Sequence, residues 1–288
     1  MGFNEFVGNQ RIVNALRGAL RAERVPHALL FTGTSGVGKY TLARMFAQAA
    51  TCERMKDDFC GECDTCKRVT LLANPASLVQ QGLAERGESA DAAMVERTPL
   101  ILIAPSPYSL LPTIVSRCMQ FHFAPLPQAD VERILKEKAD RKGAEITLAA
   151  QFAEGSPGLA MEMDVEMTAQ RRADALRILT RAARGQGFAQ LFADTAAMAK
   201  DRETTFERQL GIFYGLLTDL LELSAKIKNP MLRNKPLAKE LEALSKIVDV
   251  AWVMRAIAGF DELHAGARRN LNRQLGLDAL AASLAVNA

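Results

Sequence analysis

The spacing of apolar residues divides the chain into an α/β first half and an all-helical second half. Residues 10–25 carry apolar positions at helical intervals with charged residues between them, and Pro26 ends this predicted helix. Its apolar positions are Ile12, Leu16 and Leu20. Residues 28–31 form a short, uniformly apolar run, as expected of a buried parallel strand, and residues 100–104 and 119–123 predict two further strands.

Beyond the third strand every predicted element is a helix. Residues 128–143, 148–153 and 157–163 predict three short helices, and Ser156 is placed to cap the last of them. From about residue 165 the chain reads as helical throughout. One longer helix there carries a stripe of apolar residues, namely Phe206, Leu210, Phe213, Leu217 and Leu220.

Three features of this helical half are interpreted from their neighbours in the sequence. Asp249 precedes an apolar helix and is expected to be its N-cap. Trp252 is the single tryptophan and is expected in the core rather than in a ligand platform. The pair Arg171-Arg172 is interpreted as part of a solvated helix face.

The composition of the chain indicates which class of protein it belongs to. The chain has 288 residues, of which 49% are hydrophobic and 24% charged, which suits a globular protein of two or three domains. The net charge of +3 neither demands nor excludes a nucleic-acid partner. No apolar run approaches the length of a membrane span, and residues 1–5 do not open a signal peptide. We therefore expect a cytoplasmic protein.

A phosphate-binding loop follows the first predicted strand. Residues 33–39 read G-x-x-x-x-G-K and lead into a helix predicted over residues 40–50. The glycines let successive backbone N–H groups point at one anion, and the lysine reaches the outer phosphates. The candidate nucleotide-binding residues are Gly33, Thr34, Ser35, Gly36, Val37, Gly38, Lys39, Tyr40 and Thr41.

One position of this loop departs from the motif. The residue after the lysine is normally Ser or Thr, because its hydroxyl holds magnesium, whereas this chain has Tyr40 there. Thr41 comes one place later, turned by about 100° around the helix. The sequence therefore predicts the fold of the loop and leaves two alternatives for its use, binding of ATP or ADP without hydrolysis, or a glycine-rich turn that binds nothing.

Four of the five cysteines lie close together and follow the pattern C-x7-C-x2-C-x2-C. They are Cys52, Cys60, Cys63 and Cys66. Four free thiols and a redox pair are the alternatives to a metal site, but a redox pair would leave two of the cysteines unexplained. We therefore predict a structural Zn²⁺ site, and four sulfur ligands would leave no open position for catalysis.

The order of these motifs resembles that of the bacterial clamp-loader ATPases of the AAA+ class. The shared features are the Val-Gly-Asn-Gln entry at residues 7–10, the strand at residues 26–31, the loop, and the cysteines that follow it. Ser116-Arg117-Cys118 matches the family's Ser-Arg-Cys motif. Residues 155–160 stand where the family has its sensor-2 helix, and residues 270–284 resemble the last helix of its collar domain.

The resemblance implies an architecture and a set of partners. The expected fold is an α/β P-loop (AAA+) core with a parallel sheet and an inserted zinc module at 52–66, over residues 1–125. A helical lid over 126–168 and an all-helical oligomerisation domain over 169–288 would follow. The family forms hetero-pentameric rings of clamp-loader subunits that open a sliding clamp and place it on primed DNA.

Departures from the family pattern point to one of its branches. ATP-hydrolysing members carry an arginine at the position of Gly158, and this chain also lacks the magnesium hydroxyl. These losses, with Arg117 retained, are most similar to the delta-prime or stator branch of the DNA polymerase III clamp loader, in which Arg117 would be an arginine finger for a neighbour's ATP. The alternatives are a self-contained P-loop ATPase, a gamma/tau-like ATPase subunit, and a chain too shortened to fold stably.

The stretch between Cys66 and Thr98 is the largest departure. The family has two strands and two helices there, including the acidic Walker B strand, whereas residues 73–97 are mostly polar and show no hydrophobic run ending in paired carboxylates. Losing those strands would remove one edge of the sheet and leave the three predicted strands side by side. A natural deletion, a faulty gene model and a deliberately shortened sequence are the alternatives for the origin of this gap.

Overall fold

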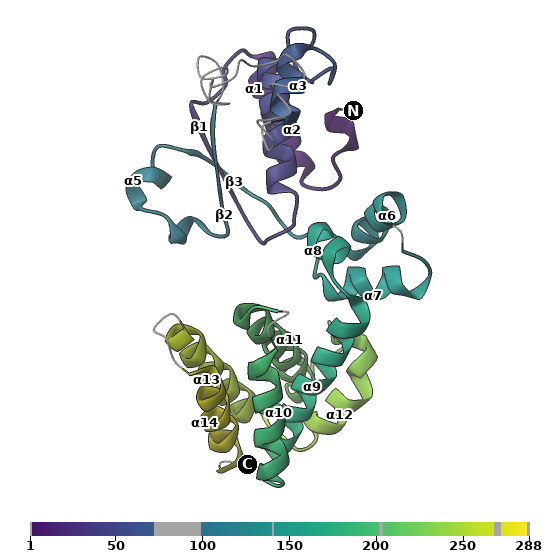
Figure 1. The fold of residues 1–288 in the computed structure, drawn as a ribbon, viewed down its shortest axis with the longest axis vertical. Helices are drawn as coiled ribbons and strands as arrows, with labels where there is room; N and C mark the ends of the chain where they lie inside the picture. The colour runs from purple at the N-terminus through teal and green to yellow at the C-terminus, as the bar shows by residue number, and fades with distance from the viewer. Residues whose placement is uncertain (1, 72–98, 140, 202–203, 268–271, 287–288) are drawn as a thin grey trace. The chain divides into compact units, whose positions relative to one another are not determined.

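The computed structural model describes residues 2–71, 99–139, 141–201, 204–267 and 272–286 (Figure 1). The chain forms two compact units, Met1–Glu162 and Met163–Ala288. The expectation that residues 73–97 lack a Walker B strand falls on a segment outside the described residues. Among the helices described, none combines the length and the apolar character needed to cross a membrane.

The first unit is built on a small parallel sheet. Its strands are β1 (Ala28–Thr32), β2 (Leu100–Ala104) and β3 (Met119–His122), in the order β2-β1-β3. Strand β1 pairs with both neighbours over its whole length or nearly so, and from Leu29 to Thr32 it is buried. The three strands therefore lie side by side as expected from the sequence, with the most buried strand in the centre.

One side of this sheet is covered by helices from the N-terminal part of the chain (Figure 1). They are the 3-10 helix η1 (Phe3–Glu5) and the α-helices α1 (Gln10–Arg21), α2 (Lys39–Thr51) and α3 (Asp64–Leu71). The core between them contains Leu16, Phe31 and Phe46, all fully buried or nearly so. Helix α1 ends before the predicted position because Glu23 adopts a left-handed conformation, with φ of 52°.

Three helices that we call the lid complete the first unit. They are α6 (Gln128–Lys138), α7 (Ala144–Phe152) and α8 (Pro157–Glu162). Val131, Ile134 and Leu135 of α6 are buried, and this helix is shorter than predicted, while α7 begins earlier. The connection from β2 to β3 carries the short elements η2 (Pro107–Ser109) and α5 (Pro112–Val115).

The second unit is entirely helical. It contains α9 (Val165–Arg184), α10 (Phe188–Lys200), α11 (Phe206–Ser224), η3 (Lys235–Leu237), α12 (Ala238–Ser245), α13 (Val250–Ala267) and α14 (Arg273–Val286). The predicted apolar stripe lies on α11, and all five of its residues are buried. Trp252 is buried as predicted, and its indole Nε1 donates to the carbonyl of Leu284 at 3.2 Å. Asp249 caps α13 by accepting from the backbone N–H of Trp252 at 2.8 Å.

Candidate functional site

The phosphate loop joins β1 to α2 and has the backbone shape its glycines predict. Gly33, Gly36 and Gly38 all have positive φ values, of 134°, 77° and 95°. A side chain at these positions would be strained, because L-residues rarely adopt such conformations. Gly38 stands directly before the first turn of α2, so the loop ends at a helix N-terminus.

Lys39 is turned into the loop rather than toward solvent. Its Nζ donates to the carbonyl oxygens of Gly33 at 2.7 Å and Thr34 at 2.6 Å. Only 8% of the residue is exposed, and burial lowers the pKa of this ammonium group below its ordinary value. The charge that would contact a nucleotide's outer phosphates is therefore held by carbonyl groups of its own loop.

The start of lid helix α8 covers the same loop through backbone and hydroxyl contacts. The backbone N–H of Gly158 donates to the carbonyl of Gly36 at 2.9 Å, and Ser156 Oγ donates to the carbonyl of Ser35 at 2.8 Å. A Cβ built on Gly158 would come within 2.9 Å of the Gly36 Cα. The arrangement therefore favours glycine at position 158 and leaves no room there for the arginine that the family resemblance implies for ATP-hydrolysing members. Ser156 also caps α8 as predicted, by accepting from Leu159 N at 3.2 Å.

The position that would support magnesium is occupied by an exposed aromatic ring. Tyr40 is 62% exposed in the first turn of α2, and Thr41 is also exposed. The structure thus brings the residues of the loop and the lid together, and position 40 carries an exposed phenol ring where the motif normally has Ser or Thr.

The four predicted cysteines lie together around the end of α2 and the start of α3. Their Sγ atoms are all within 4.8 Å of one another, and Cys63 and Cys66 are buried. Zinc bonds of about 2.3 Å in a tetrahedron place sulfurs about 3.8 Å apart, so only a small contraction of this cluster is needed. The donor set and its spacing therefore fit a closed metal site.

The surroundings act differently on the thiols of this cluster. Hydrogen bonds from the backbone N–H groups of Cys63 and Glu62 lower the pKa of Cys60. Burial opposes ionisation of Cys63, but hydrogen bonds from Thr65 and from backbone groups outweigh it and bring its pKa down to about 6. Burial raises the pKa of the Cys66 thiol. A coordinated cation would remove the cost of ionising this buried sulfur.

Arg117 lies at the other end of the sheet from the phosphate loop. The loop follows the carboxyl end of β1, whereas Arg117 precedes the amino end of β3, and the two strands are parallel. Arg117 is exposed, and its guanidinium donates to the carbonyl of Thr113 at 2.8 Å. Two apolar side chains on the same connection are also exposed, Tyr108 at 95% and Leu111 at 66%. This placement keeps Arg117 away from the phosphates that its own loop would bind.

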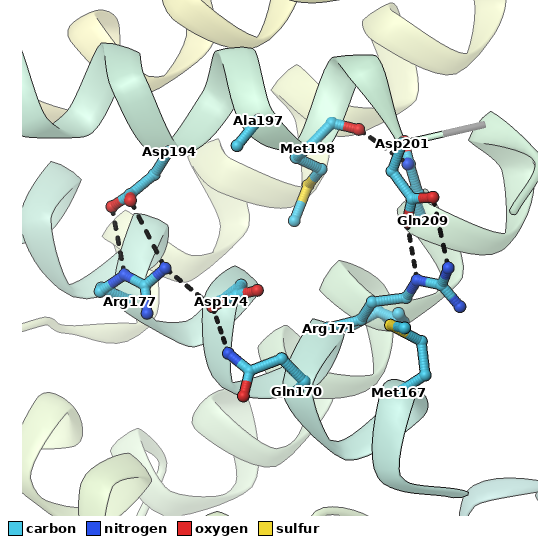
Figure 2. A pocket seen from close by; sticks show the side chains of 11 residues that line it. Met167, Gln170, Arg171, Asp174, Arg177, Asp194, Ala197, Met198, Asp201 and Gln209 are labelled. Carbon is cyan, nitrogen blue, oxygen red and sulfur yellow. Dashed lines mark hydrogen bonds and ion pairs between the residues drawn. The ribbon is translucent and has the colours of Figure 1, made fainter. Parts of the chain in front are cut away.

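A pocket in the second unit contains none of the predicted site residues (Figure 2). It lies among α9, α10 and α11, and its apolar lining includes Met167, Met198 and Ile212. Its charged groups are paired with one another. Arg171 contacts Asp201 at 2.7 Å, and Arg177 contacts Asp174 at 2.7 Å and Asp194 at 3.3 Å. The hydrogen bond that Arg177 donates to Asp194 is the main cause that raises the pKa of its guanidinium. These pairs favour a structural role for the pocket's walls.

Comparisons with known proteins point to one family. Residues 8–81 match the family described as "DNA polymerase III, delta subunit". The chain is similar to DNA polymerase III subunit tau of Escherichia coli, with 29% identity over 199 residues, which cover 54% of this chain and 31% of that protein. It is also similar to subunit tau/gamma of Haemophilus influenzae, with 28% identity over 174 residues that cover 46% of this chain and 25% of the relative.

A shorter match to DNA polymerase III subunit tau of Bacillus subtilis is closer in sequence. It has 41% identity over 69 residues, covering 24% of this chain and 12% of that protein. The chain thus spans about a quarter to a third of the length of the Haemophilus and Escherichia relatives. The family match at residues 8–81 includes the phosphate loop and the cysteine cluster.

Proposed function

Because the chain belongs to the DNA polymerase III clamp-loader subunits, in the group of delta, gamma and tau, we propose that it serves as the delta-prime or stator-like subunit of such a loader. In this role it joins a hetero-pentameric ring with other loader subunits in the cytoplasm. The ring opens the sliding clamp and places it on primed DNA, and this chain provides a fixed subunit and not an ATP-hydrolysing one.

Three features of the phosphate loop together carry the choice of the stator branch. The phosphate loop is covered by its own lid through the contact of Gly158 with Gly36, and Lys39 is held by loop carbonyls. Tyr40 replaces the hydroxyl that magnesium needs. Each feature opposes ATP hydrolysis at this loop by a different physical cause, so their combination supports a subunit that does not turn over ATP itself.

We propose Arg117 as an arginine finger that acts on a neighbour's ATP, and its place at the amino end of β3 supports this role. A guanidinium contacts phosphate oxygens through several donors and stabilises charge that develops as the bond breaks. Since Arg117 stands at the opposite end of the sheet from its own loop, an ATP that it contacts belongs to another subunit. The exposed apolar residues Tyr108 and Leu111 on the same connection suit burial against that subunit.

The cysteine cluster completes the proposal as a structural zinc site. Cys52, Cys60, Cys63 and Cys66 would hold Zn²⁺ through four sulfurs, a coordination that leaves no position for substrate. When bound, the metal supplies a crosslink between the end of α2 and the start of α3. The purified chain should contain one zinc per molecule, and Cys63→Ser should lower that ratio. A ratio near zero with four titratable thiols would refute the site.

A gamma/tau-like ATPase is the second candidate, because the relatives named above are tau or tau/gamma subunits and the loop keeps Lys39. The two candidates predict different behaviour of the isolated chain. As a stator it should release negligible phosphate from ATP at steady state. Phosphate release that Lys39→Ala abolishes would favour the ATPase and exclude the stator.

Assembly tests the wider proposal. Native mass spectrometry of the chain mixed with partner loader subunits should show a ring that contains one copy of it. The same mixture without this chain should give incomplete assemblies. A chain that remains monomeric with every loader subunit present would contradict membership of the ring.

A further inference from the structure

The loop between the first two cysteines holds the N-terminal segment of the chain. This loop, residues 53–59, begins and ends at two members of the cluster, Cys52 and Cys60. Its three last residues, Asp57-Asp58-Phe59, contact η1 and α1. The hydrogen-bonded partners are at least 36 positions apart in the sequence. We call these three residues the clasp.

Asp58 binds the backbone of the first 3-10 helix. Its Oδ1 accepts the N–H of Phe3 at 3.1 Å and the N–H of Phe59 at 2.9 Å, and only 8% of the residue is exposed. The other oxygen lies against Gly2, where a Cβ would come within 3.0 Å of it. A buried carboxylate that accepts two backbone donors is a strong local tie, because losing it leaves both donors unsatisfied.

The neighbours of Asp58 add a contact on each side. Asp57 accepts from Arg21 Nε at 2.7 Å and from Arg17 at 3.2 Å, both on α1. The ring of Phe59 packs edge-on against that of Phe3, with centroids 6.0 Å apart. The clasp therefore binds η1 through a backbone hydrogen bond and an aromatic contact, and α1 through ion pairs.

The segment that the clasp holds also reaches the phosphate loop. Phe6, directly after η1, is buried, and its ring atoms lie 3.1 Å from where a Cβ on Gly38 would stand. From Gly38, helix α2 leads directly to Cys52 at its end. The phosphate loop is thus joined to the cysteine cluster twice, once along α2 and once through the clasp and the N-terminal segment.

From these contacts we propose that the cysteine module is a metal-dependent clasp, which orders residues 2–21 and, through Phe6, the packing at the base of the phosphate loop. A metal fixes the two ends of the loop that carries the clasp, so the conformational freedom of the residues between them, including the clasp, is reduced. The inference rests on the proposed metal site and extends it, since it assigns the module a mechanical partner within its own chain.

Hydrogen exchange of the full chain, followed by mass spectrometry of its peptides, tests this clasp. Zinc-loaded protein is compared with protein stripped by a chelator, and peptides of the second unit, residues 163–288, are the internal reference. We expect residues 2–21 and residues 33–39 to exchange roughly tenfold faster after stripping, with no change in the reference peptides.

Two variants separate the clasp from the metal. Asp58→Ala should keep one zinc per chain and yet show the fast exchange of residues 2–21. Asp58→Asn retains Oδ1 as an acceptor and should behave like the unchanged protein. If Asp58→Ala fails to fold, the comparison of loaded with stripped protein still decides.

The outcomes are distinct. A chain that binds no zinc overturns the inference together with the metal site. A chain that binds zinc, but whose residues 2–21 exchange equally fast when loaded and stripped, overturns the clasp alone. Asp58→Ala with normal zinc content and unchanged exchange would also overturn it. None of these results alters the proposed role of Arg117, which stands on other contacts.

Discussion

The two units of this chain bury their apolar residues in different ways. In the helical unit the whole stripe on α11 is buried, together with Trp252. In the α/β unit only the central strand is buried throughout, while Leu100 and Ile103 of β2 are 59% and 42% exposed and Met119 of β3 is 54% exposed. The helical unit has a closed core, and the α/β unit has a sheet whose outer strands are only partly covered.

The difference follows from how each element satisfies its backbone. A helix makes its hydrogen bonds internally, so a bundle needs only apolar faces that match. A strand needs neighbours on both sides, and within the described residues β2 and β3 each pair with β1 alone. We therefore expect the stability of the α/β unit to depend on further contacts, mainly those of the lid, the clasp and the cysteine cluster.

The largest effect expected from this comparison is in the helical core. Phe213 is fully buried and stacks on Phe260 with centroids 4.4 Å apart, so Phe213→Ala should cost about 3–5 kcal/mol of unfolding free energy. Trp252 is the chain's single tryptophan, so its fluorescence during denaturant unfolding reports on this unit.

The matched control is Ile103→Ala in the exposed outer strand. It should leave the tryptophan-detected midpoint unchanged and cost less than about 1 kcal/mol in an exchange measurement of the α/β unit. An equal loss of unfolding free energy for Phe213→Ala and Ile103→Ala would contradict the comparison, because β2 would then be as well packed as α11.

A smaller loss is expected from a buried polar group of the helical unit. Asp219 is fully buried and accepts from Arg233 N at 2.9 Å and from the backbone and side-chain nitrogens of Asn234, each at 2.8 Å. Asn234 in turn accepts from buried Arg172. Asp219→Ala should cost about 2–3 kcal/mol, because these donors lose a charged acceptor. A tryptophan-detected midpoint like that of the unchanged protein would show that the network is dispensable.

Two glycine substitutions should have opposite effects on the stability of the α/β unit. Gly158→Ala places a Cβ against the Gly36 Cα, so it should loosen the lid and speed hydrogen exchange of residues 33–39. Gly18 is helical and has open space around its Cβ position, so Gly18→Ala should stabilise α1 by about 0.5–1 kcal/mol. Equal stabilisation by both substitutions would mean that Gly158 of the lid is not closely packed against the phosphate loop.

The smallest effect on stability concerns the outer strand, but self-association should change. Ile103→Lys adds a charge beside the outer edge of β2, and charged residues on edge strands oppose pairing between molecules. Light scattering at high protein concentration should fall, with unfolding shifted by less than about 0.5 kcal/mol. Unchanged scattering would show that this edge does not govern association.

Local patterns predicted much of this molecule. The phosphate loop, the cysteine cluster and the three strands depend on residues close together in sequence, and their positions agree with the predictions. The neighbouring order of the strands came from the family resemblance. The end of α1 was misplaced because Pro26 was used as the signal, whereas the left-handed residue Glu23 ends the helix earlier.

Contacts between distant residues were beyond the reach of spacing. Arg172 was interpreted as part of a solvated helix face, which is wrong, because it is 5% exposed and bonds to Asn234, 62 positions away. The interpretation of Gly158 was also incomplete, since the family resemblance implied only that an arginine is absent at this position. Its contact with Gly36 gives the physical reason, which no local motif contains.

The central claim is that this chain acts on a neighbour's ATP and not on its own. Arginine fingers contribute roughly 10³–10⁵ in turnover in small GTPases, and one finger among several sites of a ring should matter less. The decisive measurement is DNA-stimulated ATP hydrolysis by loaders reconstituted with Arg117→Ala or Lys39→Ala, after native mass spectrometry confirms that each ring is complete. The account predicts a several-fold drop with Arg117→Ala and no change with Lys39→Ala. A drop with Lys39→Ala and unchanged hydrolysis with Arg117→Ala would contradict it.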